Sequence, residues 1–175
     1  MIGVSVSRTI LSLANAVAQA TPLTRWFPIR QYLYARAGVG VAGSAKLCGG
    51  VRIVHANATI GMGTWLGIGC ELLPTRASSV TIGNRCDIGP GVMFVVGSHR
   101  IGPTARRAGA GTSSPISVGD GSWVGARSTF LGGGAVGCGC IVAAGSLVTD
   151  SFPDNVLVAG VPARIVRELP EETEE

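Results

Sequence analysis

The chain has 175 residues, which suits one domain of ordinary size with a hydrophobic core of its own and is short for two domains. Hydrophobic residues make up 46% of the chain and charged residues only 14%, which argues against intrinsic disorder, and no apolar run is long enough to span a bilayer. The net charge is +4, and because four of the ten acids lie in the final tail, the body of the chain is more basic than this total indicates. A basic body favours an anionic small ligand or simple solubility. No nucleic-acid-binding motif accompanies it. Those tail acids are Glu171, Glu172, Glu174 and Glu175.

The N-terminal segment predicts an amphipathic helix that covers one end of the core. Its apolar residues recur at helical spacing, at Val6, Ile10, Leu13 and Val17. The stretch ends in Ala18-Gln19-Ala20, which resembles a signal-peptidase site, but a single Arg8 is a poor positive flank for a signal peptide. A signal peptide and a membrane-surface helix therefore stay as alternatives, and one basic residue also argues against the second.

A second helix is predicted from Ile29 to Ala37. Pro28 favours its start and Gly38 its end, while Thr21-Pro22 stops the first helix. Arg30 and Arg36 lie on this second helix and are expected in solvent. We therefore expect residues 1–37 to form a helical cap.

A six-residue period organises the rest of the chain. In its clearest stretch the repeated positions are Val118, Val124, Phe130, Val136, Val142 and Val148. Earlier positions are Val41, Leu47 and, after a one-residue slip, Val54, Ile60, Leu66 and Leu72, then Ile82, Ile88 and Phe94 after an interruption at 74–80. A period of six fits neither a helix nor a simple alternation and is typical of β-helix coils, in which each hexad gives one flat face and one corner. Residues 38–153 then make about five stacked coils, and residues 154–175 a C-terminal cap and acidic tail.

Five cysteines occur without a CxxC pair, which argues against disulfide and zinc frameworks. Cys138 and Cys140 lie two residues apart, where alternate residues of a strand point the same way. We therefore expect both to be small apolar core residues in a reducing compartment.

Three motifs in order make the chain resemble the hexapeptide-repeat acyltransferases, most closely the maltose/galactoside and colanic-acid-type O-acetyltransferases. They are Ile82-Gly83-Asn84, the run from Val118 to Gly125, and the run from Val158 to Arg164. The resemblance covers about residues 38–168. It implies an all-β fold, a left-handed parallel β-helix with an N-terminal helical cap, a homotrimer with active sites between subunits, and acetyl-CoA as donor. The handedness comes from the resemblance alone, because the general rule for parallel crossovers is right-handed.

His99 is the predicted catalytic base. It closes Val96-Gly97-Ser98-His99 directly before the longest break in the period, where the resembled family has the histidine that deprotonates the acceptor. A sugar hydroxyl is a poor nucleophile at neutral pH, and a positioned imidazole takes its proton during attack on the thioester. Arg100 and Gly91 depart from the family, which often has Pro or Asp at the first position and in several members an acceptor-holding Asn at the second. The acceptor therefore need not be maltose or galactoside.

The donor site is predicted mainly from the same resemblance. Trp123 looks like part of the wall near the thioester, and a slender pantetheine arm is expected to lie close to backbone amides at the small residues Gly125, Gly133, Ala143 and Gly145. Arg164 and Arg167 are predicted contacts for the CoA phosphates, since guanidinium groups suit phosphate geometry. Packing and capping are the structural alternatives for these residues.

The segment 100–115 breaks the period and is predicted to be a loop that leaves the prism beside His99. Arg106 and Arg107 within it either attract CoA phosphates or an anionic acceptor, or belong to a solvated, mobile insertion. The sequence favours neither interpretation.

Together these features predict a cytoplasmic acetyl-CoA-dependent O-acetyltransferase that acetylates a sugar or glycan precursor in polysaccharide assembly, without a covalent enzyme intermediate. No nucleic acid, stable membrane insertion or metal is expected. The argument against a metal is the number of histidines: γ-class carbonic anhydrases share the coil but bind zinc through three histidines, and only His55 accompanies His99. His55 is expected to be structural or on the surface. The alternatives are acetylation of a drug hydroxyl, as in streptogramin and chloramphenicol acetyltransferases, and a non-catalytic β-helix scaffold.

Overall fold

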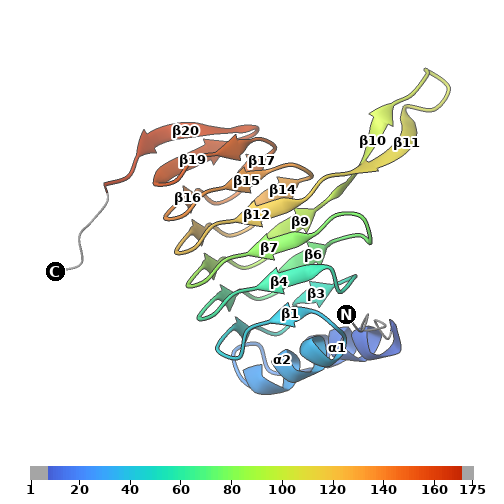
Figure 1. The fold of residues 1–175 in the computed structure, drawn as a ribbon, viewed down its shortest axis with the longest axis vertical. Helices are drawn as coiled ribbons and strands as arrows, with labels where there is room; N and C mark the ends of the chain where they lie inside the picture. The colour runs from blue at the N-terminus through green and yellow to red at the C-terminus, as the bar shows by residue number, and fades with distance from the viewer. Residues whose placement is uncertain (1–7, 171–175) are drawn as a thin grey trace, which may run out of the picture.

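The protein is a triangular prism of short strands with two helices at its base, as a computed structural model describes it for residues 8–170 (Figure 1). The helices are α1 (Arg8–Ala20) and α2 (Phe27–Arg36), and they pack side by side beneath the first coil. Both occur where the sequence predicts helices, but the face of α1 was wrong: Leu13 is 53% exposed, and Leu11, Ala14 and Ala18 are the buried residues. Val6 and the acidic tail lie outside the described residues. Neither helix is long and apolar enough to cross a membrane.

Three sheets form the walls of the prism, here called faces A, B and C. Face A consists of β1 (Gly40–Val41), β4 (Ala58–Ile60), β7 (Val80–Ile82), β12 (Ile116–Val118), β15 (Ala135–Val136) and β18 (Ser151–Phe152). Face B consists of β2 (Lys46–Leu47), β5 (Trp65–Leu66), β8 (Asp87–Ile88), β13 (Trp123–Val124), β16 (Ile141–Val142) and β19 (Val156–Gly160), followed by the antiparallel β20 (Ala163–Glu168). Face C consists of β3 (Arg52–Ile53), β6 (Glu71–Leu73), β9 (Met93–Val95), β14 (Thr129–Leu131) and β17 (Leu147–Val148). The chain passes from A to B to C in each turn, so the described residues contain five complete turns and part of a sixth.

The hexad residues fill the interior of the prism. Each of the six positions from Val118 to Val148 is at most 3% exposed. Phe94 and Phe130 come from successive coils on face C, and their ring centroids lie 5.0 Å apart. Since one coil buries its apolar face only against the next, the regular stacking of these side chains fixes the register of all three faces.

The slip in the period lies one hexad later than the sequence analysis predicted. Val54 was expected to point inward, but it is 39% exposed and Ile53 takes the core position. Ile53 follows Leu47 by six residues, so the extra residue falls in the turn before Ile60. There the backbone N–H of Asn57 donates to Nδ1 of His55 at 3.1 Å, and this contact helps to close the longer turn.

Four of the five cysteines are buried, and the fifth differs from its prediction. Cys48, Cys70, Cys86 and Cys140 are buried, and burial raises the pKa of the Cys70 thiol to about 12. Cys138 was predicted to be a core residue together with Cys140, but it is exposed. The prediction was wrong because both cysteines lie in the corner between β15 and β16, where the two-residue alternation of a strand does not apply.

Hydroxyl groups and glycines hold adjacent coils together at the corners. Thr64 Oγ1 donates to the Gly83 carbonyl at 2.6 Å, and Ser122 Oγ donates to the Gly137 carbonyl at 2.9 Å. Each acceptor belongs to the next coil, so these buried side chains satisfy carbonyls that the corner would otherwise leave unpaired. At Gly125 a Cβ atom would lie 2.8 Å from the Cα of Ala144, so the coils approach too closely there for a larger residue.

Arg30 is not in solvent as predicted but fully buried between α2 and the first coil. Its Nε donates to the Leu47 carbonyl at 2.7 Å, Nη1 donates to Thr21 Oγ1 at 2.7 Å, and Nη2 donates to the Arg25 carbonyl. Burial lowers the pKa of Arg30, but these acceptors compensate the charge. Arg30 thus donates to the first coil and to the turn between the two helices, and these hydrogen bonds stabilise the inward orientation of its face of α2. Arg36 is exposed, as expected.

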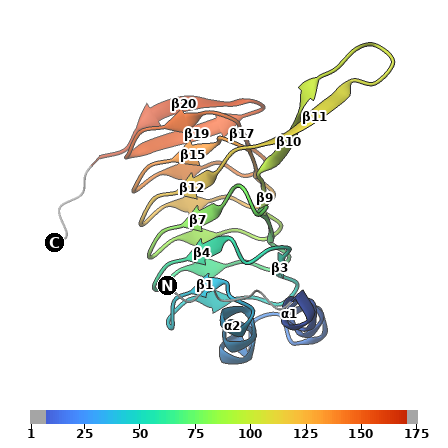
Figure 2. The same ribbon diagram turned by 45° about the vertical axis from the view of Figure 1, so that its right-hand side comes forward.

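Residues 100–115 belong to a β-hairpin rather than a simple loop. β10 (Gly97–Ile101) pairs antiparallel with β11 (Ala108–Ser113), and a register shift falls between His99 and Ile101. The hairpin projects from the upper part of the prism, far from the helices, in both views (Figures 1 and 2). All five residues of β10 are exposed, so no apolar alternation marked this strand in the sequence.

Candidate active site

His99 lies on the hairpin, at the corner where face C passes to face A. It is the third residue of β10, which continues from β9 on face C, and β11 returns the chain to β12 on face A. The imidazole is exposed on the outside of the prism. In the single chain this side chain is therefore open to solvent.

A hydrogen bond across the hairpin fixes the protonation pattern of the ring. Nδ1 of His99 lies 3.0 Å from the carbonyl oxygen of Gly109. A carbonyl oxygen only accepts, so Nδ1 carries a hydrogen and donates, and in the neutral imidazole Nε2 is then the nitrogen with the lone pair. A neutral imidazole with a free lone pair is the form that a general base requires.

Gly109 allows the two strands to approach closely enough for this bond. A Cβ atom at Gly109 would lie 2.8 Å from the carbonyl oxygen of Arg100, whereas a Cβ atom at Gly111 would meet nothing within 4 Å. Of these two glycines, only Gly109 is therefore required by packing within the hairpin. The sequence analysis did not single out Gly109, because the pairing of β10 with β11 gives it this role.

Arg106 and Arg107 lie at the far end of the hairpin, and both are exposed. Nη1 of Arg107 donates to the Gly102 carbonyl at 3.3 Å, across the turn. The backbone N–H of Arg106 donates to the Pro103 carbonyl at 2.9 Å. Arg107 thus has a structural role in the turn, while the Arg106 side chain remains at the exposed tip.

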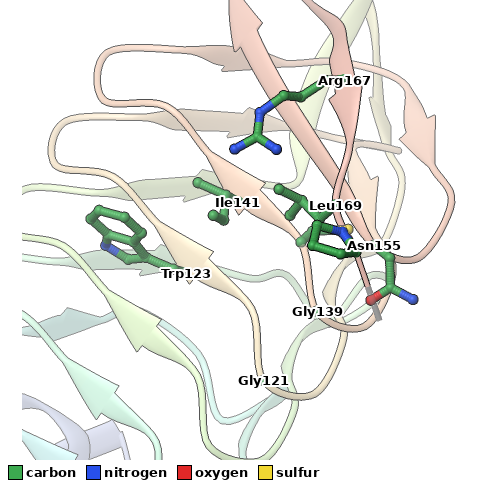
Figure 3. A pocket seen from close by; sticks show the side chains of 9 residues that line it. Gly121, Trp123, Gly139, Ile141, Asn155, Arg167 and Leu169 are labelled. Atoms are coloured by element: carbon green, nitrogen blue, oxygen red, sulfur yellow. The ribbon is translucent and has the colours of Figure 1, made fainter. Parts of the chain in front are cut away.

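Trp123 lies on face B, in a column of side chains that crosses the strands in register. It is 56% exposed, and Asp87 and Ile141 are its register neighbours on either side. The column continues through Leu157 to Arg167 on β20. The upper part of this column borders a shallow pocket. Its lining includes Gly121, Trp123, Gly139, Ile141, Asn155, Arg167 and Leu169 (Figure 3).

The two arginines predicted to meet CoA differ in position. Arg167 lines the pocket, and its guanidinium extends toward Ile141 (Figure 3). Arg164 does not border this pocket; its Nη1 lies 3.3 Å from Asp150 Oδ2 in an ion pair of two exposed side chains. An exposed pair of this kind contributes little free energy. The same Nη1 also donates to the Ala163 carbonyl at 2.7 Å.

The predicted small residues occupy two different corners. Gly125, Ala143 and Gly145 lie at the corner between faces B and C, and Gly133 lies at the corner between C and A. Their backbone N–H groups are already used: each donates to a carbonyl of a neighbouring coil or, for Gly133, to Pro115. These four amides are therefore poor donors for a ligand, although the absence of large side chains leaves the corners open.

Two other amides at the corner between faces B and C make no hydrogen bond within the described chain. The N–H groups of Ala126 and Ala144 have no hydrogen-bond partner among residues 8–170. Ala126 lies three residues after Trp123, beside the predicted donor wall. No sequence pattern distinguishes these two amides from their neighbours, because only the stacking of the coils shows which N–H groups are used.

One chain does not bring all of these groups together. The hairpin with His99 and Gly133 lie at the corner between faces C and A. Trp123 and Arg167 lie on face B, which in a triangular prism is the wall opposite that corner. The predicted base and the predicted donor wall are thus on different sides of one prism. Among the described residues, no group of three or more His, Cys, Asp or Glu side chains has the geometry to hold a metal ion.

The sequence is similar to those of known and putative acetyltransferases. No protein-family model matches the chain. The galactoside O-acetyltransferase of Escherichia coli is 37% identical over 91 residues, which is 52% of this chain and 45% of that enzyme. A putative acetyltransferase of Dictyostelium discoideum is 37% identical over 95 residues, 54% of this chain and 50% of the relative. The matches therefore span about half the length of these curated relatives.

Solved structures share the fold over nearly the whole chain. A hexapeptide-repeat-containing acetyltransferase from Vibrio cholerae has a TM-score of 0.80 at 25% identity, over 94% of this chain and 91% of that one. A galactoside acetyltransferase in complex with coenzyme A has a TM-score of 0.78 at 24% identity, over 94% and 81% of the two chains. These similarities confirm the left-handed parallel β-helix and the resemblance to hexapeptide-repeat acyltransferases that the motifs predicted.

Proposed function

We propose that this chain, with the fold and motif order of the hexapeptide-repeat acyltransferases, is an acetyl-CoA-dependent O-acetyltransferase that acts on a sugar hydroxyl. The hydrogen bond from His99 Nδ1 to the Gly109 carbonyl carries the proposal, because it leaves Nε2 as an exposed base. The names of similar proteins support the substrate classes. One relative is a galactoside O-acetyltransferase, and the Vibrio cholerae acetyltransferase, 26% identical, has been solved with acetyl-CoA.

His99 has one proton to move in this reaction. Its Nε2 removes the proton of the acceptor hydroxyl as the hydroxyl oxygen attacks the thioester carbon. The Gly109 carbonyl then stabilises the imidazolium, because it still accepts from Nδ1. The proton passes to the departing thiolate sulfur, and the free thiol and the acetyl ester are the products. General-base assistance of this kind contributes about 10²- to 10⁴-fold in rate.

The N–H of Ala126 is the donor that we assign to the developing oxyanion. It has no partner among the described residues and lies in the same corner as Gly125, whose own N–H is bonded to the Val142 carbonyl at 2.7 Å. A backbone donor held by the stacked coils needs no reorganisation during the reaction. Ala144, one coil further on, offers the equivalent N–H to the pantetheine arm.

The donor wall consists of Trp123 and Arg167 in this proposal. The exposed indole of Trp123 gives a flat apolar surface that excludes water from the reacting carbon. The Arg167 guanidinium borders the same pocket and suits a phosphate of CoA. Arg164 serves as a secondary phosphate contact if it leaves Asp150.

The positions of these groups support an active site shared between subunits. In a cyclic homotrimer, the hairpin of one chain meets a wall of the next, and every interface is equivalent. Each of three sites then combines His99 from one chain with Trp123 from its neighbour. This arrangement accounts for the separation of the two groups on a single prism.

The acceptor is proposed to be a sugar or glycan precursor, as expected for polysaccharide assembly. Arg106, at the exposed hairpin tip, is the better of the two hairpin arginines for an anionic acceptor, since Arg107 also bonds to Gly102. A reaction that consumes acetyl-CoA would take place in the cytoplasm.

The proposal is tested by the release of free CoA thiol from acetyl-CoA over a panel of sugars and hydroxylated antibiotics. His99→Ala is expected to lower kcat/KM about 10²- to 10⁴-fold. His55→Ala is the matched control, because it removes the other histidine and should leave activity near wild type. Activity retained in His99→Ala would overturn the base assignment. Acetylation of antibiotics alone would replace the sugar acceptor, and no thiol release with any acceptor would favour a scaffold.

A further inference from the structure

We propose that the base of the prism docks onto a membrane surface that carries anionic lipids. The surface concerned, called the basal surface, is formed by α2 and the turn before it. It consists of Leu23, Arg25, Trp26, Ile29, Tyr32 and Arg36. Nothing in the acetyl-transfer proposal uses these residues.

Large apolar groups are exposed together on the basal surface. The exposed fractions are 52% for Leu23, 55% for Trp26, 46% for Ile29 and 63% for Tyr32. Ile29, Tyr32 and Arg36 follow one another at helical spacing and form one outward stripe of α2, while Arg30 on the opposite side is fully buried. A cluster of exposed apolar side chains in a small domain marks an interaction surface.

The backbone at Trp26 supports a role for its side chain. Trp26 takes the N-cap position of α2 in the left-handed region, with φ of 60°, and makes no side-chain capping hydrogen bond. Bulky residues rarely adopt this conformation, and Asn or Gly would do so at lower cost. Helix capping therefore does not account for tryptophan here, whereas an exposed indole that contacts a partner does.

The charge of this end of the molecule indicates the kind of partner. The first 70 residues contain no Asp or Glu, and the first acid, Glu71, pairs with Arg52 at 3.0 Å. Arg25 and Arg36 are exposed on the basal surface, and Arg8 is exposed on the neighbouring α1. The cap is thus a cationic surface without acidic side chains of its own, complementary to an anionic one.

Anionic lipid fits both properties. Trp and Tyr side chains favour the headgroup region, and arginines next to a membrane are attracted by anionic lipids. A second copy of the basal surface would bring like charges together. A phosphate backbone would pair with the arginines but would gain little from Leu23 or Ile29. The turn before α2 and the outward stripe of the helix would contact the headgroup region through these side chains, without insertion of the helix itself.

The position of the basal surface leaves the proposed active site free. The helices lie at one end of the prism, and the hairpin and β20 lie toward the other end in both views (Figures 1 and 2). Docking would therefore hold the hairpin away from the lipid. Binding to vesicles is also measurable without acetyl-CoA, so its result does not depend on the proposed activity.

The test is flotation of the full chain with vesicles of phosphatidylcholine, either alone or with about a quarter phosphatidylglycerol. Wild type should float with the anionic vesicles only, and less at high salt. Arg25→Glu/Arg36→Glu should reduce this binding about tenfold or more, whereas Arg76→Glu/Arg85→Glu, the same charge change on the side of the prism, should reduce it less than about threefold. Trp26→Asn/Tyr32→Ser tests the apolar part, since Asn tolerates the backbone at position 26.

A melting temperature for each variant shows whether it is folded. Equal loss in the two charge-reversal variants would overturn the proposal in favour of a general charge effect. No flotation of wild type, or binding unchanged in the basal variants, would also overturn it. Assembly of wild type into a larger oligomer that the basal variants do not form, without flotation, would assign the surface to a second copy instead.

Discussion

Arg30 donates its Nε to the backbone carbonyl of Leu47 at 2.7 Å and thereby ties α2 to the first coil of the prism. The guanidinium is fully buried in a part of the chain that has no acidic residue, so its charge is compensated by a hydroxyl, by carbonyl dipoles and by the Phe27 ring, whose centroid lies 5.5 Å from Cζ. Its planar fork serves several acceptors at once, which a lysine ammonium does not match. The helical cap should therefore depend on arginine at this position.

We expect Arg30→Lys to lower the free energy of unfolding by about 2 kcal/mol, because buried carbonyls lose their donors. Urea unfolding measures the change. Arg36→Ala, on the exposed side of the same helix, should change stability by less than about 0.5 kcal/mol. Equal stability of Arg30→Lys and wild type would show that the fork does not fasten the cap.

Asp120 should make stability depend on pH in the acid range. The side-chain amide of Asn84 donates to Asp120 Oδ2 at 3.0 Å and the Asn84 backbone N–H donates to Oδ1 at 2.8 Å, and these bonds lower the pKa of Asp120. A lowered pKa in the folded state adds stability above the unfolded pKa, near 4, and this stability is lost as the pH falls through the folded pKa.

Asp120→Asn should consequently be less stable than wild type near neutral pH, and the difference should shrink below about pH 4. Urea unfolding between acid and neutral pH measures it. Asn84→Ala removes the side-chain donor, so the double variant should be less destabilised than the sum of the two single changes. A difference that does not vary with pH would contradict the assignment.

The sequence predicted the coil well and the departures from it poorly. Val118 and the hexad positions after it are buried as expected, because one period controls both the core and the corners. Val54 was misplaced because two adjacent apolar residues, Ile53 and Val54, offer the same pattern with the slip on either side. Arg30 was misplaced because arginine is usually exposed and its acceptors come from the turn and the coil.

The candidate site shows the same division. Motif position singled out His99 and Trp123, but their separation on one prism follows from the order of the three faces. The hairpin was hidden because its strands pair through backbone groups and bury no apolar face. The side chain of Ala126 gives no indication of a role, and only the hydrogen bonds of the folded chain show that its backbone N–H is unpaired.

Gly125 should be required for stacking rather than for catalysis alone. A Cβ atom there would lie 2.8 Å from the Val142 carbonyl oxygen and from the Ala144 Cα, both backbone atoms of the next coil. Gly125→Ala should therefore cost about 2 kcal/mol or more in the free energy of unfolding. Gly43→Ala is the control, since a Cβ atom there meets nothing within 4 Å, and its melting temperature should stay near that of wild type. Equal melting temperatures for both variants would show that the coils can separate at this corner.

Gly109→Ala should impair activity without unfolding the prism. The added methyl group would press on the Arg100 carbonyl and shift β11, and with it the carbonyl that orients His99. We expect kcat to fall about tenfold or more with little change in melting temperature, because the hairpin stands outside the core. Gly111→Ala, on the same strand and in register with His99, has open space and should keep wild-type kcat. A loss in both variants would mean that the strand, not the orienting carbonyl, is sensitive.

Substitutions of Arg167 and Arg164 should differ in their effect on the KM for acetyl-CoA. Arg167→Ala removes a cation that borders the pocket beside Trp123, and loss of a charged hydrogen bond to phosphate should raise the KM for acetyl-CoA about tenfold or more. Arg164→Ala removes an exposed ion pair with Asp150 and should change this KM by less than about threefold.

Steady-state assays with acetyl-CoA and with its 3′-dephospho analogue then identify the phosphate concerned. If Arg167 meets the 3′-phosphate, the analogue should have a raised KM with wild type and no further rise with Arg167→Ala. If it meets the diphosphate, the variant should raise the KM for both donors. A wild-type KM in Arg167→Ala would remove Arg167 from the donor wall.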